Sequence, residues 1–237
     1  MNRRPAGLLA VAASLSLPIV ATSPSSASPP APGVCAGVPG CHVVARVDVD
    51  GDGERDTVGI ARRGEEGAER GAVLVRVRLA SGRTLSTTRR TEFWFGPLWQ
   101  GAAALDGRAG KELVVGRTTG AHAQIFQALA YRTGRLGKAQ WLELLPAPGK
   151  GRYWYIDRAV WISAGWKKVA GEPAGVIHKR IAMRRGDATR SPFDGTATKY
   201  RWTRDGWERL HVRTVKDMSD QQVDRWGGWR VPGLQRW

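Results

Sequence analysis

Apolar and polar residues alternate along much of the chain beyond residue 42, with the period of two that half-buried β-strands show. The clearest case is the segment 73–79, in which valines take one face and arginines the other. Segments 43–47 and 57–61 are short and rich in β-branched residues, and a returning strand begins at Arg83. No long amphipathic helical pattern is evident, so we expect an all-β protein.

The same plan recurs further along the chain. Residues 113–116 correspond to 57–60, and a strand at 125–131 is followed by a turn and a return at Arg135. A looser third unit begins near Trp154 and ends in a hairpin at Asp205-Gly206, the strongest short hairpin signal in the sequence. These recurrences predict antiparallel, propeller-blade-like sheet repeats, about three in number. Because ordinary propellers close with about four to eight blades, we expect this set to be incomplete or compactly closed.

An acidic loop lies between the first two predicted strands. In the segment 48–56, DVDGDGERD, aspartates occupy loop positions 1, 3, 5 and 9 and a glycine occupies position 6. A hard cation such as Ca²⁺ prefers a shell of oxygen ligands that this spacing can supply. The expected ligands are the side chains of Asp48, Asp50 and Asp52, the backbone carbonyl of Glu54, and Asp56 as the closing carboxylate. The alternative is a solvated acidic turn, in which alternating aspartates would repel one another without a cation.

The loop does not follow the EF-hand pattern. The twelfth position, where an EF-hand has a bidentate glutamate, is Gly59, and the flanking segments are strand-like. The pattern D-x-D-x-D-G-x-x-D entering a strand resembles the FG-GAP/VCBS repeats of extracellular β-propeller proteins. That resemblance, sharp over residues 46–60, implies a calcium ion held between two strands of a blade.

A second, eroded copy of this loop follows at residues 104–112. It keeps Asp106, and Glu112 lies near the closing position. The intervening aspartates are absent, and the basic residue Lys111 directly precedes Glu112. We therefore expect this copy to be metal-free, with Asp106 accepting hydrogen bonds from backbone amides instead.

The N-terminal residues predict export. Residues 1–27 have the charged start, apolar stretch and small-residue end of a secretory signal peptide, and 28–41 are a Pro/Ser/Ala-rich linker that carries Cys35 and Cys41. In an oxidising compartment these cysteines predict a disulfide, and a zinc site with His42 lacks a convincing fourth ligand. Residues 42–237 are expected to form a single β-repeat domain of a secreted, extracellular protein with no transmembrane segment.

The chain is strongly basic, with a formal net charge of +16. This balance favours contact with polyanions such as acidic cell-wall polymers, anionic lipid or nucleic acid. For this chain we expect an extracellular ligand such as an anionic cell-wall polymer or a glycan, and we do not expect nucleic acid. The alternative is a GC-rich genome that favours arginine codons.

Tryptophan is also abundant, with 11 residues in the chain. Most are expected to fill the spaces between twisted sheets. At the C-terminus, aromatic rings interleave with arginines in a way that suits a polyanion or glycan surface. The residues of this candidate surface are Arg225, Trp226, Trp229, Arg230, Arg236 and Trp237. The alternative is a terminal strand that folds back onto the first sheet.

Three hypotheses of function follow. The first is a secreted, calcium-stabilised β-repeat module with a non-enzymatic binding role at the cell surface or outside it. The second is a secreted polyanion binder that acts by charge through its Arg/Trp surface. The third is an extracellular hydrolase with structural calcium, but no two of the four histidines share a ligand or triad spacing.

Overall fold

The first predicted repeat forms a four-stranded antiparallel sheet. The computed structural model describes residues 33–149, 151–186 and 190–236, so the predicted signal peptide lies outside the described residues. The strands follow one another in the order β1-β2-β3-β4. They span β1 (Cys41–Val47), β2 (Asp56–Arg63), β3 (Gly71–Arg78) and β4 (Thr84–Thr91).

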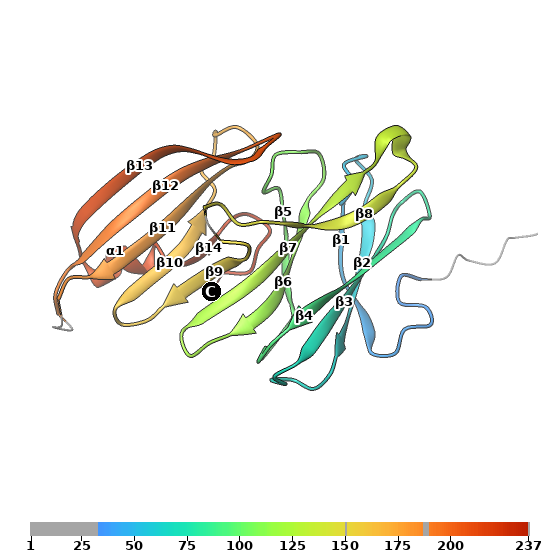
Figure 1. Ribbon diagram of the computed structural model, residues 1–237, viewed down its shortest axis with the longest axis horizontal. Coiled ribbons are helices and arrows are strands. Elements are labelled where there is room, and N and C mark those ends of the chain that lie inside the picture. Colours follow the sequence, from blue (N-terminus) through green and yellow to red (C-terminus); the bar gives the residue numbers. More distant parts are fainter. Residues whose placement is uncertain (1–32, 150, 187–189, 237) are drawn as a thin grey trace, which may run out of the picture. The chain divides into compact units, whose positions relative to one another are not determined.

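The remaining strands join a second sheet, whose main path runs β13-β12-β11-β10-β9-β7-β6-β5 (Figure 1). Its strands are β5 (Trp99–Ala103), β6 (Glu112–Thr119), β7 (Ala123–Thr133), β8 (Gln140–Leu145), β9 (Trp154–Arg158), β10 (Ile162–Lys167), β11 (Val176–Arg184), β12 (Phe193–Thr203), β13 (Gly206–Met218) and β14 (Gly228–Arg230). Strand β7 pairs along one edge with both β8 and β9, at successive segments. The second and third predicted repeats are therefore continuous with each other.

The all-β prediction is confirmed, and antiparallel hairpins dominate both sheets. Two local expectations need correction. The return after β7 begins at Gln140, because Arg135–Gly137 forms a 3₁₀ turn. In the last hairpin the two turn residues are Arg204 and Asp205, and Gly206 pairs with Thr203 as the first residue of β13, at a φ of 112°.

Helix is scarce in the described part of the chain. The α-helix α1 (Asp220–Asp224) follows β13 and starts with a capping box, in which Ser219 and Gln222 each accept the other's backbone amide. No helix among the residues described is long and apolar enough to cross a membrane.

Both sheets contribute to one hydrophobic core, in which aromatic rings meet edge to face. Phe126 on β7 lies between Trp94, at a centroid distance of 5.6 Å, and Trp229, at 5.4 Å. The ring of Trp154 on β9 continues this row toward Trp166, at 4.7 Å. Since each indole buries a large apolar area, the expectation that most tryptophans fill inter-sheet space is supported.

The C-terminal segment enters this core. Strand β14 pairs in parallel with β10, and Leu234 bridges to Gly101 on β5. The alternative of a terminal strand on the first sheet is therefore wrong, because the segment pairs with the second. Trp229 is 1% exposed and Trp226 is 9% exposed, so these two rings do not form the exposed surface that the sequence suggested. Arg225 and Arg236 remain exposed, Arg230 is half-buried, and Trp237 lies outside the described residues.

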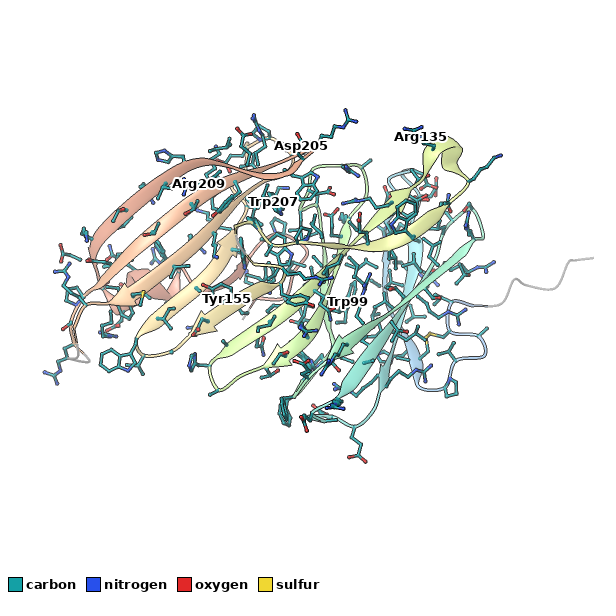
Figure 2. All side chains as sticks on the ribbon, in the orientation of Figure 1. Trp99, Arg135, Tyr155, Asp205, Trp207 and Arg209 are labelled. Atoms are coloured by element: carbon teal, nitrogen blue, oxygen red, sulfur yellow. A yellow bond between two sulfur atoms is a disulfide. The ribbon has the colours of Figure 1, made fainter. Side chains whose placement is uncertain are left out.

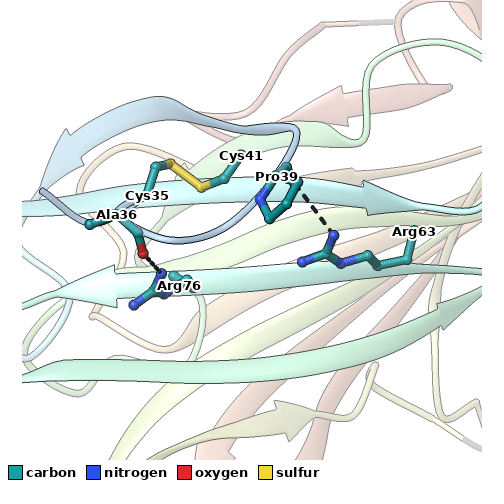
Figure 3. The surroundings of a disulfide bond; sticks show 6 residues. All are labelled: Cys35, Ala36, Pro39, Cys41, Arg63 and Arg76. Atoms are coloured by element: carbon teal, nitrogen blue, oxygen red, sulfur yellow. Dashed lines mark hydrogen bonds between the residues drawn. A yellow bond between two sulfur atoms is a disulfide. The ribbon is translucent and has the colours of Figure 1, made fainter.

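The predicted disulfide between Cys35 and Cys41 is confirmed, and it lies directly over β2 (Figure 3). The loop that carries it is fixed by arginines of the first sheet. Arg76 donates to the carbonyl of Ala36 at 3.0 Å, and Arg63 donates to that of Pro39 at 3.3 Å. A Cβ atom at Gly59 would lie 2.8 Å from the Cys35 sulfur, so the strand can accept the disulfide only where it carries no side chain.

This contact gives a first prediction. Gly59→Ala should destabilise the protein by about 1–3 kcal/mol, because the added methyl group overpacks the disulfide. Thermal unfolding of the oxidised protein measures the loss. Gly33→Ala is the matched control, since a Cβ there meets nothing within 4 Å. Equal melting temperatures for Gly59→Ala and the control would show that the disulfide does not press on β2.

Candidate metal site

The first acidic loop connects β1 to β2 and gathers three carboxylates. Asp48, Asp50 and Asp56 each place an oxygen within 4.8 Å of the others. Asp48 and Asp50 belong to the loop and are half-buried, whereas Asp56 is the first residue of β2 and is fully buried. These three residues are among the five that the sequence predicts as ligands.

Backbone amides hold these carboxylates in place. The two oxygens of Asp56 accept from the amides of Val49, at 2.7 Å, and Ala80, at 2.9 Å. Asp48 accepts from the amides of Gly51, at 2.6 Å, and Gly53, at 3.1 Å. Both glycines have positive φ, of 83° and 92°, which lets the loop turn tightly around its acidic residues.

The cluster is electrostatically strained in the absence of a cation. Burial raises the pKa of the Asp50 carboxyl, and the neighbouring charges of Asp56, Asp52 and Asp48 act in the same direction. A bound cation would remove this repulsion and would be coordinated by the carboxylate oxygens that Ca²⁺ prefers. The donor set therefore fits a hard divalent cation.

The other two predicted ligands lie differently. The Asp52 side chain accepts the amide of Glu54 at 2.8 Å and does not belong to the converging group. Both residues are exposed. A role for the Asp52 side chain or the Glu54 carbonyl in metal binding remains a prediction.

The eroded second loop, between β5 and β6, keeps the same closing interaction. Glu112 accepts the amide of Leu105 at 2.5 Å, just as Asp56 accepts that of Val49, and both bonds span the same interval of seven residues. Asp106 accepts the amide of Arg108 at 2.9 Å, which confirms its expected role in capping a backbone amide. The two loops are thus structural repeats.

Side-chain cations neutralise the second loop. The Arg132 guanidinium on β7 donates to Asp106 at 2.9 Å, and both side chains are at least nine-tenths buried. Lys168 donates to the carbonyl of Ala104 at 2.6 Å. Burial lowers the pKa of the Lys168 ammonium, while the charges of Glu112 and Asp106 act to raise it. Two basic side chains therefore meet the acidic residues here.

The two loops also pack against each other. The amide of Lys111 donates to the carbonyl of Asp48 at 3.1 Å. Gly51 lies against Ala109 and Gly110 so closely that a Cβ atom at Gly51 would clash with both. The second loop in turn packs on the backbone of Gly175, before β11. The second loop therefore packs directly against the loop that carries the converging carboxylates.

Sequence spacing alone missed two histidine–carboxylate pairs. His122 lies 2.8 Å from Asp157, and His178 lies 2.7 Å from Glu172. The partners of the first pair are separated by 35 residues, so no local motif could indicate it. In the described ranges neither imidazole makes a hydrogen bond to a hydroxyl or thiol group, so neither pair has the third member of a nucleophilic triad.

The second prediction concerns the Asp106–Arg132 ion pair. Arg132→Met should destabilise the protein by about 3–5 kcal/mol, because it leaves the Asp106 carboxylate buried without its partner. The double variant Asp106→Asn/Arg132→Met should lose less than the Arg132→Met single variant, since no unpaired charge remains. Denaturant unfolding of the two single variants and the double variant measures the coupling. Strictly additive losses would contradict the pairing.

The third prediction concerns Glu112. Burial, followed by the charge of Asp106, raises the pKa of this carboxyl to about 8. A carboxyl whose folded pKa is raised binds a proton more tightly in the folded state, so its stabilising contribution is complete below its unfolded pKa and declines as the pH rises through 8. Glu112→Gln should therefore flatten the fall in stability between about pH 5 and 8. Melting temperatures across this range test it, and parallel wild-type and Glu112→Gln profiles would contradict it.

Comparison of the chain with protein-family models, with curated proteins and with solved structures finds no match. The likeness to FG-GAP/VCBS repeats therefore rests on the residues of the first acidic loop and its flanking strands. What the chain does must be argued from the converging carboxylates, the disulfide and the surfaces of the two sheets.

Proposed function

We propose that this protein is an extracellular, calcium-stabilised β-repeat module with a non-enzymatic binding role. The observation that carries the proposal is the convergence of Asp48, Asp50 and Asp56 in a loop between two antiparallel strands. The same carboxylates are tied to backbone amides, so their positions are set before any ion arrives. Such preorganisation lowers the ordering cost of binding.

Calcium is favoured over other cations by the chemistry of the donors. The converging group supplies carboxylate oxygens and no imidazole or thiolate, which disfavours zinc and copper. Ca²⁺ accepts six to eight oxygen ligands in irregular arrangements, whereas Mg²⁺ demands a near-ideal octahedron. The Asp52 side chain, the Glu54 carbonyl and water are the proposed sources of the remaining ligands.

The disulfide supports an extracellular location. Disulfides persist in oxidising compartments and are rare in the cytosol, and the Cys35–Cys41 bridge fits the export that residues 1–27 predict. In extracellular modules calcium need bind only in the range of about 10⁻⁴–10⁻³ M. A single loop with three converging carboxylates is suited to that range.

The non-enzymatic part of the proposal rests on how the histidines are used. His178 shares Glu172 with Lys199, which lies 2.8 Å from the other carboxylate oxygen. This carboxylate is engaged by a histidine and a lysine and is poorly placed to act as a general base. The proposed hydrolase alternative would need a nucleophile or activated water beside His122 and Asp157.

The fourth prediction tests the metal. With calcium at about ten times its Kd, the bound ion should stabilise the fold by roughly 1.4 kcal/mol. Chelator should therefore lower the melting temperature of the wild-type protein, and calorimetry should show one calcium site. Asp50→Ala should abolish both the calcium signal and the response to chelator, because it removes a ligand of the converging group.

Asp106→Asn is the matched control, since Asp106 belongs to the second loop and pairs with Arg132. It should leave calcium stoichiometry unchanged, although it is expected to lower stability. If the unfolding curves of the wild type with and without chelator superimpose, the first loop is an acidic turn that binds no stabilising metal. A drop from two sites to one in Asp106→Asn would show that the second loop also binds metal.

A further inference from the structure

One face of the sheet formed by β10 to β13 carries basic residues in rows. Lys167, His178, Lys199 and His211 are successive cross-strand partners on these four strands. Arg180, Ala197 and Arg213 form a second row on the last three strands. On each of these three strands the members of the two rows are two residues apart, so both rows share one face.

A cavity of about 420 Å³ lies over these rows. Trp226, which follows α1, lines it together with Val169 and Glu172. The volume falls within the range of about 300–1,000 Å³ that small-molecule sites occupy. This face lies on the opposite side of the sheet from the core, because Trp166 and Ile177, whose neighbours in sequence line the cavity, are buried in the hydrophobic cluster.

Arg180 is the unusual group in this cavity. It is 8% exposed, and its Nε and Nη2 atoms are buried without a hydrogen-bond acceptor in the described part of the chain. The nearest interaction of its guanidinium is with the Trp226 ring, whose centroid lies 6.0 Å away. Burial, and then the charge of Arg230, lowers the pKa of Arg180 to about 10. An unpaired buried cation is costly, so a ligand that supplies the missing acceptors would be strongly favoured.

The single acidic residue of the lining does not fill that role. The Glu172 oxygens are engaged by His178, at 2.7 Å, and Lys199, at 2.8 Å. Burial opposes ionisation of Glu172, but these two hydrogen bonds outweigh it and lower the pKa of the carboxyl. Lys167 and Arg213 form no ion pair with any acid in the ranges the structure describes. The cavity therefore keeps a surplus of positive charge.

We propose that this cavity binds the phosphate group of a phosphomonoester, with Arg180 as the buried anchor and Lys167 and Arg213 at the rim. A guanidinium fork matches the paired oxygens of a phosphate. Four basic side chains line the cavity, namely Lys167, Arg180, Lys199 and Arg213, against the one carboxyl group of Glu172. This surplus suits a dianion better than a carboxylate or a phosphodiester, and the volume leaves room for the organic part of the ligand.

The inference gives a ligand class to the proposed binding role, but it does not depend on the calcium loop. The experiment therefore uses the mature chain in calcium-free buffer, and repeats the titration with Asp50→Ala. Inorganic phosphate and glycerol phosphate are titrated calorimetrically at about pH 8, where phosphate is a dianion. Chloride, sulfate, acetate and glycerophosphocholine, a phosphodiester, are compared at equal ionic strength, because any anion screens so basic a protein.

Inorganic phosphate and glycerol phosphate should each bind the wild type and Asp50→Ala with equal affinity. Arg180→Met should weaken binding by about tenfold or more, since it removes hydrogen bonds to a charged group. The same variant should melt at an equal or higher temperature than the wild type without phosphate, because an uncompensated buried charge is gone. A purely structural arginine would instead destabilise the fold when replaced.

Arg209→Gln is the matched control. It removes one charge from β13 (Figure 2), but Arg209 pairs with Tyr200, the neighbour of Lys199, and so lies on the face opposite to Lys199. It should bind phosphate like the wild type, whereas Arg213→Gln should bind more weakly. Arg180→Lys keeps the charge without the fork, and provides the test if the methionine variant does not fold.

Phosphate binding no stronger than chloride binding would overturn the inference. So would wild-type affinity in Arg180→Met or Arg180→Lys, or equal loss in Arg209→Gln and Arg213→Gln. Equal affinity for sulfate, acetate or the phosphodiester would overturn the assignment to phosphomonoesters. Failure of calcium binding with intact phosphate binding would leave the cavity assignment standing and refute only the calcium loop.

Discussion

The arrangement of the first two repeats depends on one interaction, a buried carboxylate that accepts the amide of a residue seven positions earlier. Asp56 does this for Val49, and Glu112 does it for Leu105. Each bond closes an acidic loop and fixes where the next strand begins. A buried acidic group needs either a proton or a counter-charge, and the two loops meet that need differently. The second loop uses Arg132 and Lys168, whereas the first gathers Asp48 and Asp50 beside Asp56 and is the one proposed to take a metal.

This difference explains why the loops are packed together. The first loop, without an ion, gathers repelling carboxylates, and Val49 is the one apolar side chain that it places in the core. Its position is set by the second loop, through the amide of Lys111 and the close approach of Gly51 to Gly110. The second loop is itself fixed by an ion pair that forms within the chain. A copy of the motif that contains its own ion pair thus packs against the copy for which a metal is proposed as the counter-charge.

The sequence predicted what depends on neighbouring residues and failed where distant segments meet. Strands β1 to β4, the acidic loop and the Cys35–Cys41 bridge are local features, and the structure has them where the patterns indicated. The pairing of Asp106 with Arg132, or of His122 with Asp157, joins a loop residue to a strand far along the chain and leaves no periodic signal. The prediction of an exposed C-terminal Arg/Trp surface was wrong because the arginines between the tryptophans suggested exposure, whereas Trp226 and Trp229 are buried. Because Gly165 on β10 carries no side chain, the backbone of Gly228 can approach it closely, and this brings Trp229 into the core.

The arginines that make the chain basic fall into two groups, those exposed on strand faces and those buried. A genome that favours arginine codons would scatter guanidinium groups over exposed strand faces, where they cost little, and many arginines of the two sheets are of that kind. Such a bias does not explain a guanidinium buried away from water without an acceptor, because selection for stability alone would replace it with an apolar side chain. Arg180 is in that position, beside a cavity whose only carboxylate is already engaged. Codon bias can therefore account for the exposed arginines but not for Arg180, whose burial without an acceptor is the feature that favours an anionic ligand.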